Sequence, residues 1–219
     1  MAWDDAIAGQ RPCVLVAHAF RGRAPFECDK AEALARMGYV GFALDLYGKG
    51  VLADDAEQAY ALMGRFTQDR SLLQQRLLVC LETAAGQNEV DANQVAAIGF
   101  CFGGMSVLDM ARTGAPVKGV CSFHGLLSAP GNTAGKPIEA RIQVEHGWED
   151  PMVPPQQVLD FAQEMTDASA DWVLQAHGDT VHSFTNPAAN DRAAGTAYRE
   201  QADRRSWLSM QNFLTEVFA

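Results

Sequence analysis

A cysteine between closely spaced glycines is the residue in this sequence best suited to chemistry. Cys101 stands in the pattern Gly99-Phe-Cys101-Phe-Gly103, after the apolar run 95–99 and before a segment with helical spacing. A side chain at a sharp strand-to-helix turn has a strained backbone, and flanking glycines give the room that this turn needs. The N-terminus of the following helix would favour a thiolate. We therefore interpret Cys101 as a candidate nucleophile; the alternative is a buried cysteine in a tight turn.

Two backbone N–H groups are candidates to bind an oxyanion next to this sulfur. Phe102 directly follows the cysteine, and Phe20 lies in the turn 19–22 after the apolar strand 13–18. Both positions follow strands, and active sites of open parallel sheets lie beyond the carboxyl ends of their strands. His18 ends the first of these strands; it could be a base, but we expect a hydrogen-bonded structural residue.

A carboxyl and an imidazole follow two later strands. Asp150 comes just after the strand 141–146, and His182 lies in the loop after the strand 171–176. His182 would exchange a proton with the Cys101 sulfur, while Asp150 would fix its tautomer. His177 competes for the position of base, but the longer reach of the loop favours His182.

Helices are expected to alternate with these strands. The periodicity predicts strands at 13–18, 39–44, 95–99, 117–123, 141–146 and 171–176, a turn at 91–93, and helices at 27–37, 56–63, 67–85, from 103, 156–165 and 194–217. Arg65, Arg70 and Arg76 lie on amphipathic helices, where a solvated face is expected. The pattern predicts one α/β domain over residues 1–219.

Composition restricts the partners. A net charge of −10 argues against a nucleic acid partner. The start of the chain has no signal-peptide pattern and no run is long enough to span a bilayer, so we expect a cytoplasmic protein without a membrane partner. Five cysteines without a C-x-x-C pair indicate free thiols, and the absence of H-E-x-x-H argues against zinc, so no cofactor or metal is expected.

At this point the sequence resembles the dienelactone hydrolase family, which is a branch of the α/β-hydrolases. The matching segments are Val14-Leu-Val-Ala-His, Met37-Gly-Tyr-Val-Gly-Phe-Ala-Leu-Asp-Leu-Tyr-Gly, Gly99-Phe-Cys-Phe-Gly-Gly, Gly147-Trp-Glu-Asp-Pro-Met-Val-Pro and His182-Ser-Phe. The resemblance implies a mostly parallel sheet with helices on both faces. It also implies hydrolysis of a small ester, lactone or thioester through a thioacyl-enzyme, with Cys101, Asp150 and His182 as the triad. The His-Ser-Phe match favours His182 over His177.

The sequence departs from the family in three ways. Ala19 stands where dienelactone-opening members have a Glu that interacts with the resting thiol, and Asn186 stands where they have a substrate-binding arginine. Arg21 and Arg23 could replace such arginines, although we expect both to be solvated surface residues. Dienelactone itself is not expected to be the substrate. The edge hairpin that usually precedes the strand at Cys13 has no full counterpart. N-terminal edge strands could therefore be absent, leaving an edge for a dimer partner or the first residues to cover.

The substrate pocket is expected to be moderately apolar. Its candidate residues are Phe20, Tyr47, Phe102, Trp148 and Phe184. An acyltransferase or peptidase using the same triad is the second hypothesis. A non-catalytic binding or redox-sensing protein, in which Cys101 is oxidised, is the third. The sequence leaves monomer and homodimer open.

Overall fold

Six apolar strands lie side by side in one parallel sheet in the computed structural model, which describes residues 1–219. The sheet order is β2-β1-β3-β4-β5-β6, and a two-stranded antiparallel hairpin, β7–β8, stands apart from it. The strands are β1 (Arg11–Ala17), β2 (Val40–Ala43), β3 (Val90–Phe100), β4 (Gly119–Phe123), β5 (Arg141–Gly147), β6 (Trp172–His177), β7 (Asn190–Asp191) and β8 (Thr196–Ala197). The predicted parallel sheet is confirmed.

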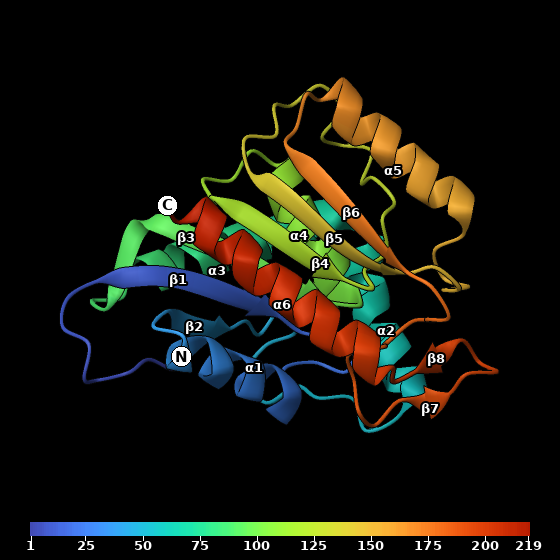
Figure 1. Ribbon diagram of the computed structural model, residues 1–219, viewed down its shortest axis with the longest axis horizontal. Helices are drawn as coiled ribbons and strands as arrows, with labels where there is room; N and C mark the ends of the chain where they lie inside the picture. The colour runs from blue at the N-terminus through green and yellow to red at the C-terminus, as the bar shows by residue number, and fades with distance from the viewer.

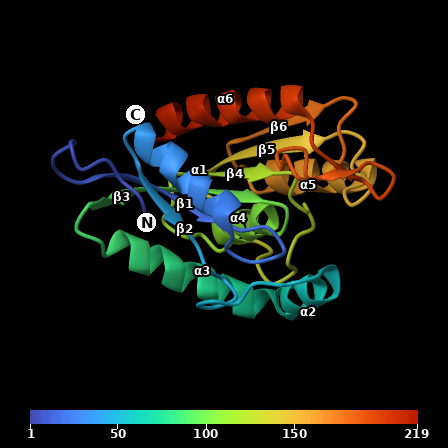
Figure 2. The same ribbon diagram turned by 90° about the horizontal axis from the view of Figure 1, so that it is seen from below.

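Helices cover both faces of the sheet (Figures 1 and 2). They are α1 (Pro25–Arg36), α2 (Ala56–Thr67), α3 (Arg70–Ala85), α4 (Phe102–Arg112), α5 (Pro155–Asp167) and α6 (Glu200–Val217). Figure 2 shows α1 and α6 on one side of the sheet and α2 and α3 on the other. This layering is the α/β-hydrolase architecture expected from the sequence. No helix has both the length and the apolar character needed to cross a bilayer.

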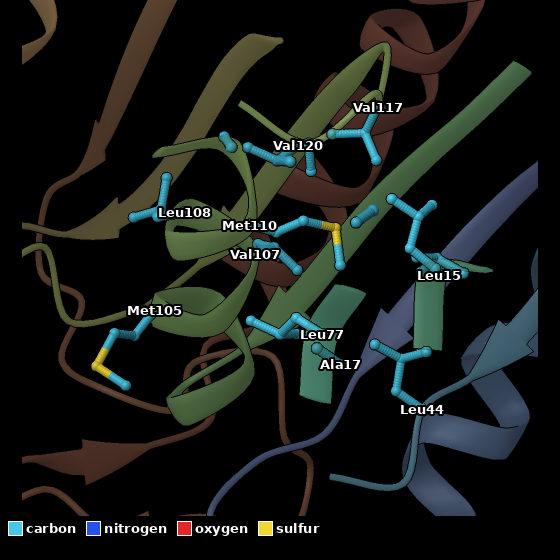
Figure 3. Packing of buried hydrophobic residues seen from close by; sticks show 14 of the residues in the cluster. Leu15, Ala17, Leu44, Leu77, Met105, Val107, Leu108, Met110, Val117 and Val120 are labelled. Atoms are coloured by element: carbon cyan, nitrogen blue, oxygen red, sulfur yellow. The ribbon is translucent and has the colours of Figure 1, made fainter. Parts of the chain in front are cut away.

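The larger core fills the α3 and α4 side of the sheet. It joins 31 buried residues, whereas the cluster under α1 and α6 joins 13. Leu15 and Ala17 of β1 meet Leu77 of α3 and Met110 of α4 in this larger cluster (Figure 3). Alternate residues of the central strands therefore face opposite cores, and both faces of these strands are apolar.

Three predicted boundaries are wrong. Residues 91–93 belong to β3. Val90 pairs with Arg11 and Val95 with Cys13, so five steps along β3 match two steps along β1, and the turn-like sequence makes a bulge. Helix α2 continues past Gly64 to Thr67. The last helix starts at Glu200 and not at Ala194, because residues 190–197 form the β7–β8 hairpin.

The first residues of the chain cover part of the β2 edge. Ala2 and Gly41 exchange two backbone hydrogen bonds in an antiparallel bridge, with N···O distances of 2.8 and 2.9 Å. The covering of this edge by the first residues, one of the two expected arrangements, is therefore present at this position.

A buried network of ion pairs joins helices α3, α4 and α5. Asp109 of α4 accepts hydrogen bonds from Arg70 of α3 at 2.5 Å, and Arg112 of α4 forms two hydrogen bonds with Glu164 of α5 at 2.7 and 2.9 Å. The solvated face predicted for Arg70 is wrong, because its side chain is only 11% exposed. The partner carboxylate lies 39 residues away along the chain, so the helical pattern around Arg70 contains no sign of it.

Candidate active site

Cys101 occupies a strained turn between β3 and α4. Its φ is +56°, in a region that a residue other than glycine rarely adopts. A Cβ on Gly99 would lie 2.1 Å from the Gly103 carbonyl oxygen, and one on Gly103 would lie 2.1 Å from the Ala17 carbonyl oxygen. The glycines are therefore required because helix α4 packs directly onto strands β1 and β3.

Asp150 and His182 come together as the sequence predicts. His182 Nδ1 lies 2.7 Å from Asp150 Oδ2, and both side chains are almost completely buried. The other Asp150 oxygen accepts the Met152 N–H at 2.8 Å, which fixes the carboxylate. The His182 Nε2 atom is buried and has no hydrogen-bond partner within the chain.

Burial and charge act in opposite directions on His182. Burial lowers the pKa of this imidazole, but the negative charge of the Cys101 sulfur and the bond to Asp150 outweigh it and raise the pKa to about 10. Cys101 is the first of the raising causes, although its sulfur does not form a hydrogen bond with His182 Nε2 in this structure.

The hairpin that the sequence did not predict holds His182 in place. The His182 N–H donates to the Gly195 carbonyl at 3.0 Å, and the Ala197 N–H donates to the His182 carbonyl at 3.1 Å. Gly195 has φ +82°, and a Cβ there would lie 2.3 Å from the Pro151 side chain. The hairpin therefore links the loop of the imidazole to the loop of the carboxylate.

A cavity of about 160 Å³ lies beside Cys101. Three of the five non-glycine residues with positive φ in the chain, Cys101, His124 and Ser183, line it. Backbone strain persists only where surrounding structure enforces it, and such strain concentrates at functional sites. The remaining lining residues are Ala19, Phe20, Arg21, Gly22, Ala24, Phe26, Glu27, Phe100, Thr185 and Asn186.

The two predicted oxyanion donors lie near the sulfur in different ways. Phe20 lines the cavity, and its N–H has no acceptor within the chain. Phe102 is the first residue of α4, where the N–H groups lack helical partners. Its ring is fully buried against Tyr47 and Phe66.

Of the five predicted pocket residues only Phe20 lines this cavity; Phe102 and the three others do not. Tyr47 is buried, and its hydroxyl donates to the Phe20 carbonyl at 2.9 Å, so it supports the turn that carries Phe20. Trp148 is half exposed. Phe184 is completely buried, with its ring against His124 and His177.

The competing base, His177, is already engaged elsewhere. Its Nε2 atom lies 2.7 Å from the buried Glu145 carboxylate. His124 has both ring nitrogens within hydrogen-bond distance of neighbours, the Cys101 N–H at 3.2 Å and the Thr185 hydroxyl at 2.8 Å.

Glu27 is the site residue that sequence reasoning missed. It comes from the first turn of α1, is 2% exposed, and lines the same cavity as Cys101. Its carboxylate accepts the N–H groups of Ala19 and Ala24, each at 3.0 Å, while burial raises its pKa. A Glu three residues after a helix start usually indicates a cap, so the pattern gave no sign that its carboxyl borders a cavity.

The two arginines next to the Phe20 turn, Arg21 and Arg23, differ in whether they line the cavity. Arg21 lines the cavity and is exposed, with its guanidinium 3.4 Å from the Asp54 carbonyl oxygen. Arg23 is not among the lining residues and lies 3.9 Å from Asp45.

Residues 3–218 match the dienelactone hydrolase family, so the chain belongs to this family. It is a dienelactone hydrolase-like hydrolase, of the class of enzymes that act on esters or lactones. This membership favours a hydrolase over the acyltransferase, binding and redox-sensing hypotheses.

Several known proteins are similar to the chain. An uncharacterised protein of Caenorhabditis elegans is 38% identical over 160 residues, which is 70% of this chain and 99% of that protein. The solved structure of m3DLH is 38% identical, has a TM-score of 0.92, and is matched over 99% of this chain and 91% of its own. The structure of P91, a dienelactone hydrolase-like promiscuous phosphotriesterase from metagenomic libraries, is 36% identical with a TM-score of 0.91 and the same coverage.

Proposed function

We propose that the chain hydrolyses small esters, lactones or thioesters through a thioacyl-enzyme on Cys101, with His182 as acid and base and Asp150 as its orienting carboxylate. The observation that carries the proposal is the state of His182. Its Nδ1 atom is hydrogen-bonded to Asp150, and its Nε2 atom is buried without a hydrogen-bond partner. The charge of the Cys101 sulfur raises the pKa of the His182 imidazole.

Acylation would begin with attack of the Cys101 thiolate on the substrate carbonyl carbon. The carbonyl oxygen becomes an oxyanion that accepts hydrogen bonds from the Phe102 and Phe20 N–H groups. When this intermediate collapses, the bond to the leaving oxygen breaks and His182 Nε2–H gives that oxygen its proton. The product of this step is a thioester on Cys101 and a free alcohol, or a tethered hydroxyl in the case of a lactone.

Deacylation would use the same groups in reverse. His182 removes a proton from water, the water oxygen attacks the thioester carbonyl, and the carbon–sulfur bond breaks. The carboxylic acid leaves, and the thiolate and the protonated imidazole are restored.

Turnover of p-nitrophenyl acetate by site variants tests this proposal. Cys101→Ala and His182→Gln should each lower kcat/KM by at least about 10³-fold, and Asp150→Asn by less. His177→Gln is the matched control and should retain most of the activity, because His177 is paired with Glu145. Mass spectrometry of a rapidly quenched reaction should show an acetyl group on Cys101. Full activity of the His182→Gln variant, or loss only in His177→Gln, would refute the assignment.

Phosphotriesters are a second substrate class, favoured by the 36% identity to P91. The Cys101 thiolate would attack phosphorus and displace an aryloxide, leaving a thiophosphate ester. Release of p-nitrophenol from a dialkyl p-nitrophenyl phosphate, abolished by Cys101→Ala, would support this second activity. A burst of one equivalent without turnover would identify the phosphotriester as an inhibitor instead.

A further inference from the structure

A fully buried histidine lies beneath the turn that carries Phe20. His18 directly follows β1 and is 0% exposed. Its ring packs against Tyr47 at 4.5 Å and against Phe102 at 5.8 Å between centroids. It is not among the residues that line the cavity beside Cys101, and both of its ring nitrogens face backbone groups.

The two ring nitrogens of His18 contact two backbone groups of opposite type. The Leu46 N–H donates to Nε2 at 3.2 Å, and Nδ1 lies 2.6 Å from the Ala19 carbonyl oxygen. An N–H donor requires Nε2 to be the unprotonated nitrogen, and a carbonyl acceptor requires Nδ1 to carry the proton. His18 is therefore a neutral imidazole of defined tautomer. Burial, the main cause, lowers its pKa to about 4, in agreement with a neutral ring.

Two hydrogen bonds hold the peptide group whose other end is the Phe20 N–H: the Ala19 carbonyl accepts the Gly22 N–H at 3.2 Å and the shorter bond from His18 Nδ1 at 2.6 Å. The chain has no cis peptide bond, so the Ala19 carbonyl and the Phe20 N–H point in opposite directions. A carbonyl held by His18 therefore directs the Phe20 N–H away from the buried imidazole. A hydrogen bond to the carbonyl of an amide also polarises that amide, which makes its N–H a stronger donor.

Other backbone groups of this turn also have hydrogen-bond partners within the chain, whereas the Phe20 N–H does not. Glu27 accepts the N–H groups of Ala19 and Ala24, and the Tyr47 hydroxyl donates to the Phe20 carbonyl. The Phe20 N–H has no partner within the chain, at the border of the cavity that contains Cys101.

We propose that His18 is a positioning residue that orients and polarises the Phe20 N–H as an oxyanion donor. This inference rests on the proposed function, because it assigns His18 to the oxyanion step of that reaction. His18 acts through one peptide group and does not exchange protons with the substrate.

Two reactions of the same sulfur separate this effect from a general loss of structure. Ester hydrolysis develops an oxyanion, whereas alkylation of Cys101 by iodoacetamide displaces iodide at a saturated carbon and develops none at that carbon. His18→Phe keeps a buried ring but removes the Nδ1 donor, and His18→Asn can still present a side-chain N–H near the same position. We expect His18→Phe to lower kcat/KM for p-nitrophenyl acetate by about 10–100-fold, less than or comparable to the loss of a whole oxyanion donor. His18→Asn should recover part of this loss, and the alkylation rate should change less than about twofold in both variants.

Unchanged ester turnover in a folded His18→Phe variant would overturn the inference, as would an equal fall in alkylation and hydrolysis. Nitrogen-15 NMR of histidine-labelled wild-type protein provides a test without any variant. It should show an Nδ1–H, Nε2-unprotonated ring for His18, and the opposite tautomer would refute the argument. Loss of the proposed function is recognised separately, because it would appear as full ester turnover in Cys101→Ala.

Discussion

Removing the charge of Asp109 is the sharpest stability test that the structure offers. In Asp109→Asn the shape of the side chain remains, but Arg70 and Arg112 lose the carboxylate that lies 2.5 and 3.4 Å from them. Asp109 is 0% exposed at its side chain, and breaking a buried pair by removing one partner costs about 3–5 kcal/mol.

The loss should fall near the lower end of this range. Arg112 keeps both bonds to Glu164, and Arg70 keeps its 3.2 Å bond to the Ser128 carbonyl. We therefore expect about 3 kcal/mol of lost unfolding free energy, which corresponds to a fall in Tm of about 6–12 °C for a chain of this size.

Urea unfolding followed by circular dichroism measures this change. Glu32→Gln is the matched control, because the Arg36–Glu32 pair is 3.9 Å apart with both side chains more than half exposed, and its loss should cost less than about 1 kcal/mol. The apolar double variant Arg70→Met/Asp109→Leu should recover most of the loss, since no charge is left uncompensated. Equal, small effects of Asp109→Asn and Glu32→Gln would refute the reasoning.

Three further predictions concern the site. Gly195→Ala should lower kcat for p-nitrophenyl acetate by about 10-fold or more with a smaller effect on Tm, because a Cβ at φ +82° would push against Pro151 and displace the loop of His182. Cys101→Ala should lower the pKa of His182 from about 10, measured by NMR titration, because it removes the sulfur charge; an unchanged value would contradict the coupling. Burial raises the folded-state pKa of Glu27, so its carboxyl destabilises the fold increasingly as pH rises above about 4.5. Glu27→Gln removes this effect. The Tm of the variant minus the Tm of the wild type should therefore increase with pH in that window.

The order of Cys101, Asp150 and His182 along the chain was predictable because local sequence patterns mark the position of each residue. Gly99 and Gly103 mark the turn at Cys101, and the ends of apolar runs place Asp150 and His182 at one edge of a parallel sheet. The hairpin at 190–197 was not predictable in this way. This hairpin contacts the His182 loop, and the local sequence gives no sign of this contact.

Two charged residues were misjudged because they contact groups outside their own helices. Glu27 looks like an ordinary helix-start residue until α1 is packed against the turn at Ala19. Arg70 looks like a solvated residue until α4 brings Asp109 beneath it. In both cases tertiary packing determines whether the face of the helix that carries the charged group is buried.

The site is assembled from two units that are held by different contacts and are joined through His124, which contacts the Cys101 N–H and the Thr185 hydroxyl. The sulfur is held by the close packing of α4 on β1, where Gly103 meets the Ala17 carbonyl. The imidazole and its carboxylate are held by the hairpin, through Gly195 against Pro151 and the two backbone bonds to His182. A substitution within one unit that leaves the His124 contacts in place should therefore preserve the internal geometry of the other unit. The distance between the sulfur and the imidazole, which the proposed proton transfer requires to be short, is the quantity that such substitutions would change.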